Sequence, residues 1–201
     1  MSKTCSVDNC NNKHYSKGYC KKHYQQFKRY GHVLERTTHD KNEMIDCGDY
    51  AEMILYNNKG EEVARTLIDL EYVDILKNHK WYLNNNGYVY NNKIGKLHRY
   101  IMNPSDDLVV DHINRNPLDN RRDNLRICTQ HYNCLNRSIQ CNNTSGVQGV
   151  CWDKNANKWK VQIMINGKLT HIGSYNTLEE AAEARKQAEI EYYGEFAPTR
   201  E

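Results

Sequence analysis

The sequence predicts an α+β protein built of three modules, and three observations lead to that prediction. Cysteine and histidine gather at metal-ligand spacing within residues 1–31. Short apolar runs alternate with turn residues across residues 44–140, which also hold one Asp-His pair. Residues 141–201 contain three strand patterns followed by one Ala-rich helical pattern. Residues 32–43 are polar and without periodicity, so we expect a linker there.

The first module has the pattern C-x4-C-x9-C-x2-H, which is typical of a tetrahedral zinc site. The expected ligands are Cys5, Cys10, Cys20 and His23. The following run KKHYQQFKRY predicts a short helix that ends at Gly31. A segment of about 30 residues has almost no hydrophobic core, so bound metal could supply the free energy that folds it. His14 is a weaker competing ligand, and a disordered basic arm with free thiols is the alternative interpretation.

Composition limits the class of protein more than it identifies it. The chain has 201 residues, 38% hydrophobic content and a formal net charge of +3. It has neither an apolar stretch of membrane length nor a signal-peptide pattern, so we expect an intracellular protein. In a reducing compartment, the eight Cys residues favour metal ligation or free thiols over disulfides. Seven of the Lys and Arg side chains fall in residues 1–31, against one Asp.

The middle module begins with patterns that indicate architecture and little chemistry. The runs AEMILYN and VARTLI predict a hairpin, and GYVYN predicts another strand. The run DLEYVDILKNHKW predicts a short helix, with Trp81 in the packed core.

The chemistry of the middle module is concentrated in residues 109–133. Asp111 and His112 stand at the tip of a predicted strand, followed by an Asn- and Arg-rich loop, the strand LRICT and a helix capped by Thr129. This order brings the first strand's end to the helix. Asp111 and Asn133 can then share Mg²⁺ through oxygen ligands, and a neutral His112 can take a proton from water. Together they predict a phosphodiesterase.

The loop itself has predicted roles as well. Asn124 is placed to tie the loop by hydrogen bonds, and Arg121, Arg122 and Arg126 are available for phosphates. An Asp-His pair alone is usually a solvated strand end. Here the loop and the second strand that follow favour an active site over that interpretation.

The last module is expected to be a three-stranded antiparallel sheet packed on one helix. Asn166-Gly167 predicts a hairpin between the second and third strands. Thr177 and Glu180 form a capping-box pattern that opens a helix ending at Gly194. Residues 146–176 hold four Lys against one Asp, whereas residues 177–201 hold three basic residues against seven Glu. Phosphates are therefore expected at the sheet.

The segments LHR at 97–99, DHIN at 111–114, DNRRDNLR at 119–126 and TQHYNCLN at 129–136 resemble the HNH endonuclease family, in its phage and intron homing branch. The resemblance implies a ββα-metal fold with one Mg²⁺ or Mn²⁺ on Asp111 and Asn133, His112 as general base and Asn124 as loop stabiliser. Asp111 stands where the family name has its first His. His98 and Arg99 would either contact phosphate or support the fold.

The flanking modules have resemblances of their own. The first is similar to short Cys/His fingers that precede phage nuclease domains. The segments SGVQGVCWD, KWKVQI and HIGSY with the final helix resemble the Apetala/ethylene-response-factor DNA-binding domain, whose sheet enters the major groove. The matching positions are Trp152, Lys154, Trp159, Lys160 and Gln162. Alternation puts Trp159 and Lys160 on opposite faces unless a bulge intervenes, and packing of Trp152 and Trp159 on the helix is the alternative.

These resemblances imply a phage-encoded endonuclease acting on double-stranded DNA in the cytoplasm of a bacterial host. One active site per chain favours nicking by a monomer, and a dimer is the route to a double-strand break. The alternative is a non-catalytic, sequence-specific DNA-binding regulator with a relic HNH unit. A nuclease directed at RNA is the third possibility.

Overall fold

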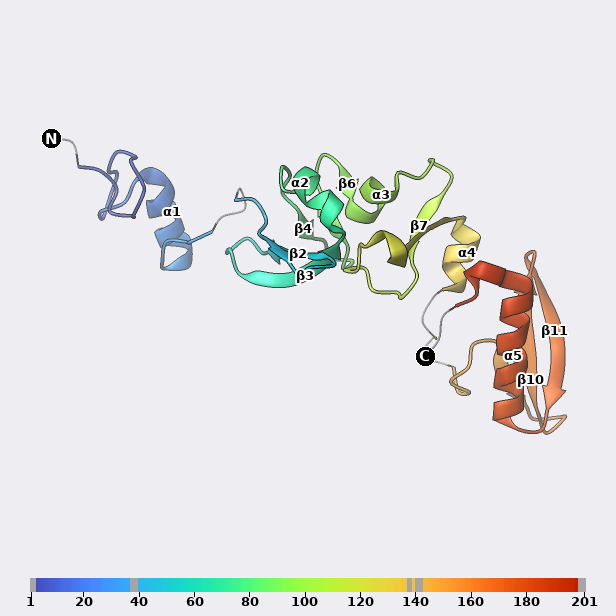
Figure 1. Cartoon of the computed structure of the whole chain (residues 1–201). Helices are drawn as coiled ribbons and strands as arrows, with labels where there is room; N and C mark the ends of the chain where they lie inside the picture. The colour runs from blue at the N-terminus through green and yellow to red at the C-terminus, as the bar shows by residue number, and fades with distance from the viewer. Residues whose placement is uncertain (1–2, 37–39, 137–138, 140–142, 199–201) are drawn as a thin grey trace. The chain divides into compact units, whose positions relative to one another are not determined.

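The computed structural model in Figure 1 describes residues 3–36, 40–136, 139 and 143–198. The chain divides into two compact units, Met1–Leu97 and His98–Glu201. Both combine small antiparallel sheets with short helices, in agreement with the α+β class predicted from the sequence.

The first unit begins with a knuckle and one helix. Isolated bridges join Thr4 to Lys13 and Ser16 to Tyr19, and α1 (Lys21–Tyr30) follows directly. Gly31 ends α1 in the left-handed conformation at φ 81°, where its N–H donates to the Phe27 carbonyl at 2.9 Å. The predicted helix and its glycine stop are confirmed.

The rest of the first unit is two three-stranded sheets joined by a helical turn. The predicted hairpin is confirmed as β2 (Ala51–Tyr56) and β3 (Glu62–Ile68), with the unpredicted β1 (Met44–Asp46) on the other edge of β2. The predicted helix is short and is split into η1 (Leu70–Tyr72) and α2 (Val73–Leu76). The second sheet consists of β4 (Tyr82–Leu83), β5 (Val89–Asn91) and β6 (Gly95–Lys96).

Trp81 is fully buried, as predicted, and Asn42 holds the chain beside it. Asn42 accepts from the Trp81 N–H at 2.8 Å and donates to the carbonyls of Trp81 and Ile54 at 2.9 and 2.7 Å. Asn42 is only 6% exposed. The expected linker therefore ends before its last residues, because a buried asparagine with three hydrogen bonds belongs to the packed structure.

After α3 (Leu97–Met102), which begins at the last residue of the first unit, the second unit has the predicted strand–loop–strand–helix order. The elements of this order are β7 (Val109–His112), η2 (Arg122–Asn124), β8 (Leu125–Cys128) and α4 (Gln130–Leu135). β7 and β8 are antiparallel, with Asp111 opposite Arg126 and His112 opposite Leu125. Thr129 caps α4 as predicted, since its hydroxyl accepts from the Tyr132 N–H at 3.5 Å.

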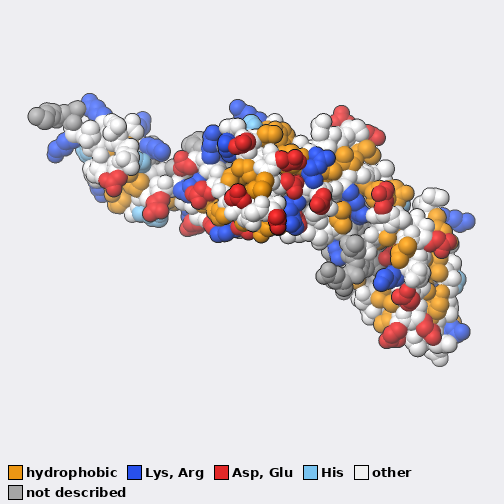
Figure 2. Space-filling model, in the orientation of Figure 1, with side chains coloured by type: hydrophobic (Ala, Val, Ile, Leu, Met, Phe, Trp, Pro, Cys, Tyr) orange, Lys and Arg blue, Asp and Glu red, His pale blue; other side chains and the backbone are white. Residues whose placement is uncertain are grey.

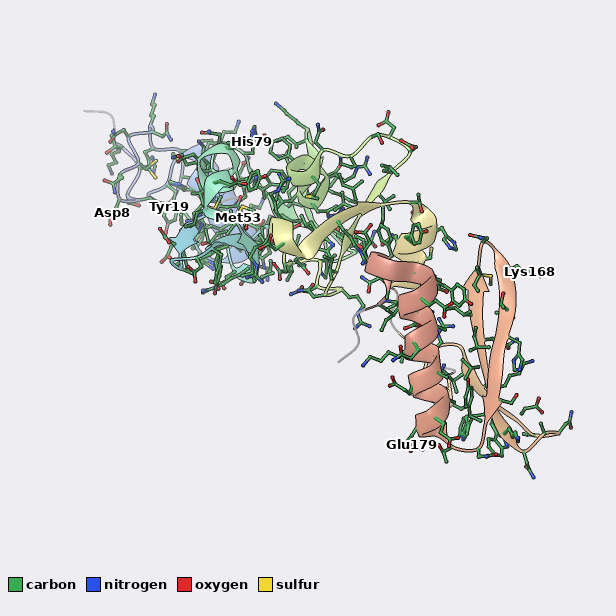
Figure 3. All side chains as sticks on the ribbon, turned by 45° about the vertical axis from the view of Figure 1, so that its right-hand side comes forward. Asp8, Tyr19, Met53, His79, Lys168 and Glu179 are labelled. Atoms are coloured by element: carbon green, nitrogen blue, oxygen red, sulfur yellow. The ribbon has the colours of Figure 1, made fainter. Side chains whose placement is uncertain are left out.

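The second unit ends in a three-stranded sheet with one helix along its face (Figure 1). The strands are β9 (Val150–Asp153), β10 (Lys158–Ile165) and β11 (Lys168–Tyr175), followed by α5 (Leu178–Tyr193) and η3 (Gly194–Phe196). The capping box of α5 is confirmed. In Figure 3, Glu179 marks the start of α5 and Lys168 the start of β11, at opposite ends of this sheet-and-helix module.

The sheet-and-helix module shares a hydrophobic core with α4. Leu135 of α4 packs with Ile163, Ala188 and Tyr193. Tyr132 of α4 stacks on Phe196 of η3 with ring centroids 4.3 Å apart. The expected boundary at residue 140 therefore separates segments whose apolar side chains are buried against each other.

Candidate active site

The Asp111-His112 pair lies at the end of β7, and both side chains are buried, at 6% exposure each. A carboxylate and an imidazole are costly to bury without partners, so their surroundings determine what they can do. Each side chain has a different set of neighbours, and the two sets come from different elements.

His112 faces Asn120 and His98. Its Nε2 lies 3.4 Å from Oδ1 of Asn120, which is fully buried and donates its Nδ2 to the Pro117 carbonyl at 3.1 Å. Because Nδ2 is the donor there, Oδ1 can accept an N–H from His112. In that tautomer Nδ1 carries the lone pair that a base requires. The ring of His98, itself 4% exposed, meets His112 edge-on with centroids 5.0 Å apart.

Asp111 is held between Arg126 of β8 and Asn136 at the end of α4. Arg126 donates its Nε at 2.9 Å and approaches with Nη2 at 2.8 Å, both to Oδ2 of Asp111. This contact follows from the register, since residues directly opposite on antiparallel strands share a face. Asn136 donates Nδ2 to the two oxygens of Asp111 at 3.2 and 3.0 Å.

Asn136 also lies at this candidate site, although the sequence pattern did not predict it there. It is 3% exposed, and its Nδ2 also reaches the carbonyls of His112 at 2.8 Å and Ile113 at 3.2 Å. Its Oδ1 is buried with no hydrogen-bond partner among the described residues. Asn133, the predicted partner of Asp111, lies one turn earlier on α4. Because Asn133 and Asn136 are three residues apart, they occupy neighbouring positions on one helix face. This spacing is the feature of the sequence from which a role for Asn136 could have been predicted.

The loop between β7 and β8 is fastened by Asn124 and Asp119. Asn124 donates Nδ2 to the Asp119 carbonyl at 2.8 Å and accepts from the Asn114 N–H at 3.0 Å. The carboxylate of Asp119, which is 2% exposed, binds Arg121 through two hydrogen bonds of 2.8 and 2.7 Å and Asn114 through one of 2.9 Å. Burial raises the pKa of Asp119, but the hydrogen bonds and the charge of Arg121 lower it by more. The pKa therefore lies below its usual range.

Several arginines expected at phosphates are engaged within the fold. Arg99 was expected either to contact phosphate or to support the fold. It donates to the Leu108 carbonyl at 2.9 Å, which favours the role in supporting the fold. Arg121 is paired with Asp119, and Arg126 with Asp111. Arg126 also donates to the Glu195 carbonyl at 2.8 Å and lies 5.3 Å from the ring centroid of Phe196. Arg122 is exposed on η2.

The positions expected to contact DNA from the terminal sheet fall on two faces. Trp152 lies opposite Trp159 and Val150 opposite Val161, so all four share the face covered by α5. Trp159 packs against that core, as in the alternative interpretation, whereas Trp152 is 41% exposed beside it. Lys160 lies opposite Cys151 on the other face, and Lys158 and Gln162 share that face by alternation. Lys154 follows β9 in the turn.

The irregularity in this sheet does not bring the two sets together. The pairing of β10 with β11 shifts between Val161 and Gln162, where the partners change from Gly173 to His171. The extra residue therefore lies on β11, and the alternation along β10 is unbroken.

The four predicted zinc ligands converge in the first unit. Their ligand atoms lie within 4.8 Å of one another, with Cys5 Sγ 3.2 Å from His23 Nδ1 and Cys10 Sγ 3.9 Å from Cys20 Sγ. Sulfur ligands of tetrahedral zinc are about 3.8 Å apart, so the set has the required size. His14 instead accepts from the Gly18 N–H at 3.1 Å. Lys and Arg side chains lie around this segment (Figure 2).

The thiol of Cys5 is set for ligation. Burial raises its pKa, but hydrogen bonds, the largest from His23, lower it more and leave the pKa at about 6. The thiolate is the form that binds metal.

Comparison with known proteins places this arrangement in a family. The model of a family described as HNH endonuclease matches residues 81–135. A protein named Uncharacterized HNH endonuclease L560, from Acanthamoeba polyphaga mimivirus, is 34% identical over 139 residues, covering 65% of this chain and 71% of the relative. Protein 3.8 of Escherichia phage T7 is 34% identical over 88 residues, covering 44% of this chain and 72% of the relative. No solved structure matches the chain.

The chain therefore belongs to the HNH endonuclease family, and it is a nuclease. Both relatives come from viruses. Among the described residues, no helix has the length and apolar character that crossing a membrane requires.

Proposed function

We propose that the protein is a metal-dependent DNA endonuclease that nicks one strand of a duplex, with His112 as its general base. The observation that carries the proposal is the buried pair at the end of β7, where Asn120 and His98 orient His112 and the carboxylate of Asp111 is fixed beside it. Nδ1 of His112 takes a proton from water, whose oxygen attacks the phosphorus as the bond to the leaving sugar oxygen breaks.

The oxygen atoms around Asp111 are of the kind that a hard divalent cation prefers, and such a cation would share the carboxylate with Arg126, which binds its Oδ2. A carboxylate, two nearby main-chain carbonyls and the buried Oδ1 of Asn136 are oxygen ligands of the kind that Mg²⁺ and Mn²⁺ prefer. We assign Asp111 and Asn133 as the ligands, with Asn136 orienting the carboxylate. Bound metal would neutralise charge that develops on the phosphate and the leaving oxygen. Asn124 keeps the loop closed, so that Asp111 and α4 stay together.

The test is nicking of supercoiled plasmid with Mg²⁺ or Mn²⁺. His112→Ala is expected to lose about 10²- to 10⁴-fold in rate, the usual contribution of a general base, while still binding DNA. His131→Ala is the matched control, since His131 is exposed on α4. Equal nicking by wild type and His112→Ala would refute the assignment of the base. A wild type inactive with both metals would favour a non-catalytic DNA-binding regulator.

The flanking modules are proposed to bind the duplex. The Cys5, Cys10, Cys20 and His23 cluster is proposed to hold Zn²⁺ and so fold the basic first segment. In the last module, the open face of β10 offers Lys158, Lys160 and Gln162 to the DNA, in the manner of the Apetala/ethylene-response-factor resemblance. Lysine side chains mainly contact phosphates, which carry no sequence information. This module is therefore expected to contribute to the affinity for DNA more than to sequence preference. Stoichiometric zinc and binding weakened by Lys160→Gln would support these roles.

A further inference from the structure

The first unit contains a pocket with a volume of about 580 Å³, and its lining residues all belong to that unit. Pockets of this size are typical of small-molecule sites. Its described lining residues include two Lys and two Tyr and no acidic residue; they are Tyr56, Asn58, Lys80, Tyr82, Asn91, Asn92 and Lys93. A pocket with cations, aromatic rings and amides suits a ligand that is both anionic and planar.

Lys80 is the feature of this pocket that most needs a ligand. Its Nζ is buried and has no hydrogen-bond partner among the described residues. Burial and the nearby Arg36 lower the pKa of Lys80, and Asp40 offsets this only in part. The contact with the Tyr56 ring, at 5.3 Å from its centroid, is weak compensation for a desolvated ammonium. A buried cation without a hydrogen-bonded anion is unfavourable, and a bound anion would offset part of that cost.

Hydrogen bonds from Asn91 and Asn42 hold the backbone around the pocket. The backbone at Lys80 and Trp81 is held on one side by Asn91, whose Nδ2 donates to the Lys80 carbonyl at 2.8 Å, and on the other by Asn42. Asn91 Oδ1 also accepts from the Lys93 N–H at 2.8 Å, which fixes the backbone of the second lysine in the lining. The backbone that carries Lys80 is therefore held in place before any ligand arrives.

The aromatic part of the pocket is Tyr82. Its hydroxyl donates to Asn92 Oδ1, and its ring meets Tyr90 edge-on at 5.6 Å, so the ring is held in one orientation. Tyr56 is already covered by cations, with the Arg36 guanidinium 4.2 Å from its ring centroid. Tyr82 is thus the ring left to stack on a planar ligand.

We propose that this pocket binds one unpaired nucleotide of a DNA strand, with its phosphate on Lys80 and its base stacked on Tyr82. The assignment to DNA rests on the proposed nuclease function, because aromatic rings beside cationic groups are how proteins hold single strands. The same chemistry would bind a free nucleotide, and the experiment below separates the two.

The test measures binding of a short single-stranded oligonucleotide to the full chain by fluorescence anisotropy over a range of salt concentration. Lys80→Met is expected to reduce the slope of log affinity against log salt by about 0.7, the value for one phosphate contact on a single strand. Tyr82→Leu should weaken binding at least about fivefold through lost stacking. Lys77→Met is the matched control, since Lys77 is exposed, paired with Asp74 and outside the pocket.

Thermal melting separates binding from structure. Lys80→Met should melt at or above the wild-type temperature, because it removes a buried ammonium without a hydrogen-bonded partner. A marked fall in melting temperature would assign Lys80 a structural role and overturn the proposal, as would an unchanged slope and affinity.

Two further measurements complete the experiment: thermal melting with a free nucleotide, and plasmid nicking by the wild type. Thymidine monophosphate should raise the melting temperature of wild type but not of Lys80→Met, and neither thymidine nor inorganic phosphate should match it. Binding of the mononucleotide without any effect of Lys80→Met on the oligonucleotide would overturn the assignment to DNA. Loss of oligonucleotide binding in Lys80→Met would stand even if wild type failed to nick plasmid, so the two proposals fail separately.

Discussion

Replacing Arg126 by Met should destabilise the second unit, because Arg126 neutralises the carboxylate of Asp111. The two side chains are 14% and 8% exposed, and Nε and Nη2 both reach Oδ2, at 2.9 and 2.8 Å. Met keeps most of the volume but leaves Asp111 with the Asn136 amide as its hydrogen-bond donor. Breaking a buried pair from one side costs about 3–5 kcal/mol, and the lost bond to the Glu195 carbonyl adds to this.

The assay is urea unfolding of wild type, Arg126→Met, Asp111→Asn and the double variant. The double variant should be less destabilised than the sum of the single ones, because the neutral amide no longer needs the cation. Arg65→Met is the control, since its partners Glu62 and Glu52 form exposed pairs, which contribute at most about 1 kcal/mol. A loss below about 1 kcal/mol in Arg126→Met, or strict additivity in the cycle, would refute the reasoning.

Three further outcomes follow from the geometry. Asp119→Asn should remove an acid-dependent part of stability: the pKa of Asp119 is lowered in the fold, so its contribution is full above the unfolded pKa, about 3.9, and is lost as pH falls through the folded one. Urea midpoints measured between neutral and acidic pH check this, and a parallel dependence in the variant would contradict it. Gly149→Ala should cost more than Gly146→Ala: both have positive φ, but only at Gly149 does a Cβ come under 3.0 Å from a β10 carbonyl and a guanidinium, and equal melting temperatures would contradict it. Cys20→Ser, or a chelator, should unfold the first segment and release one zinc per chain, and metal analysis with circular dichroism decides this.

Much of the secondary structure could be predicted from local signals. Gly31 stops α1, Thr129 caps α4, and the Thr177–Glu180 capping box opens α5, because each feature depends on residues within one turn of the chain. The convergence of the four Cys and His ligands was also predictable, since their spacing fits one small knuckle and helix turn. The elements missed are short, such as β1 with three residues, where neither periodicity nor composition gives a signal.

The sequence by itself determined the Asp111-His112 pair at a strand tip, the loop that follows and the helix that returns to it. Only the tertiary structure decided which side chains complete the site. Three residues complete it: Asn120 from the loop, Asn136 from the end of α4, and Arg126 from β8, where the strand register places it opposite Asp111. It also decided that α4 is buried against α5, so that Arg126 touches both Asp111 and the turn after α5. The physical reason is range: caps and turns are set by neighbours in sequence, whereas buried polar groups take whatever partner the packing brings within hydrogen-bond distance.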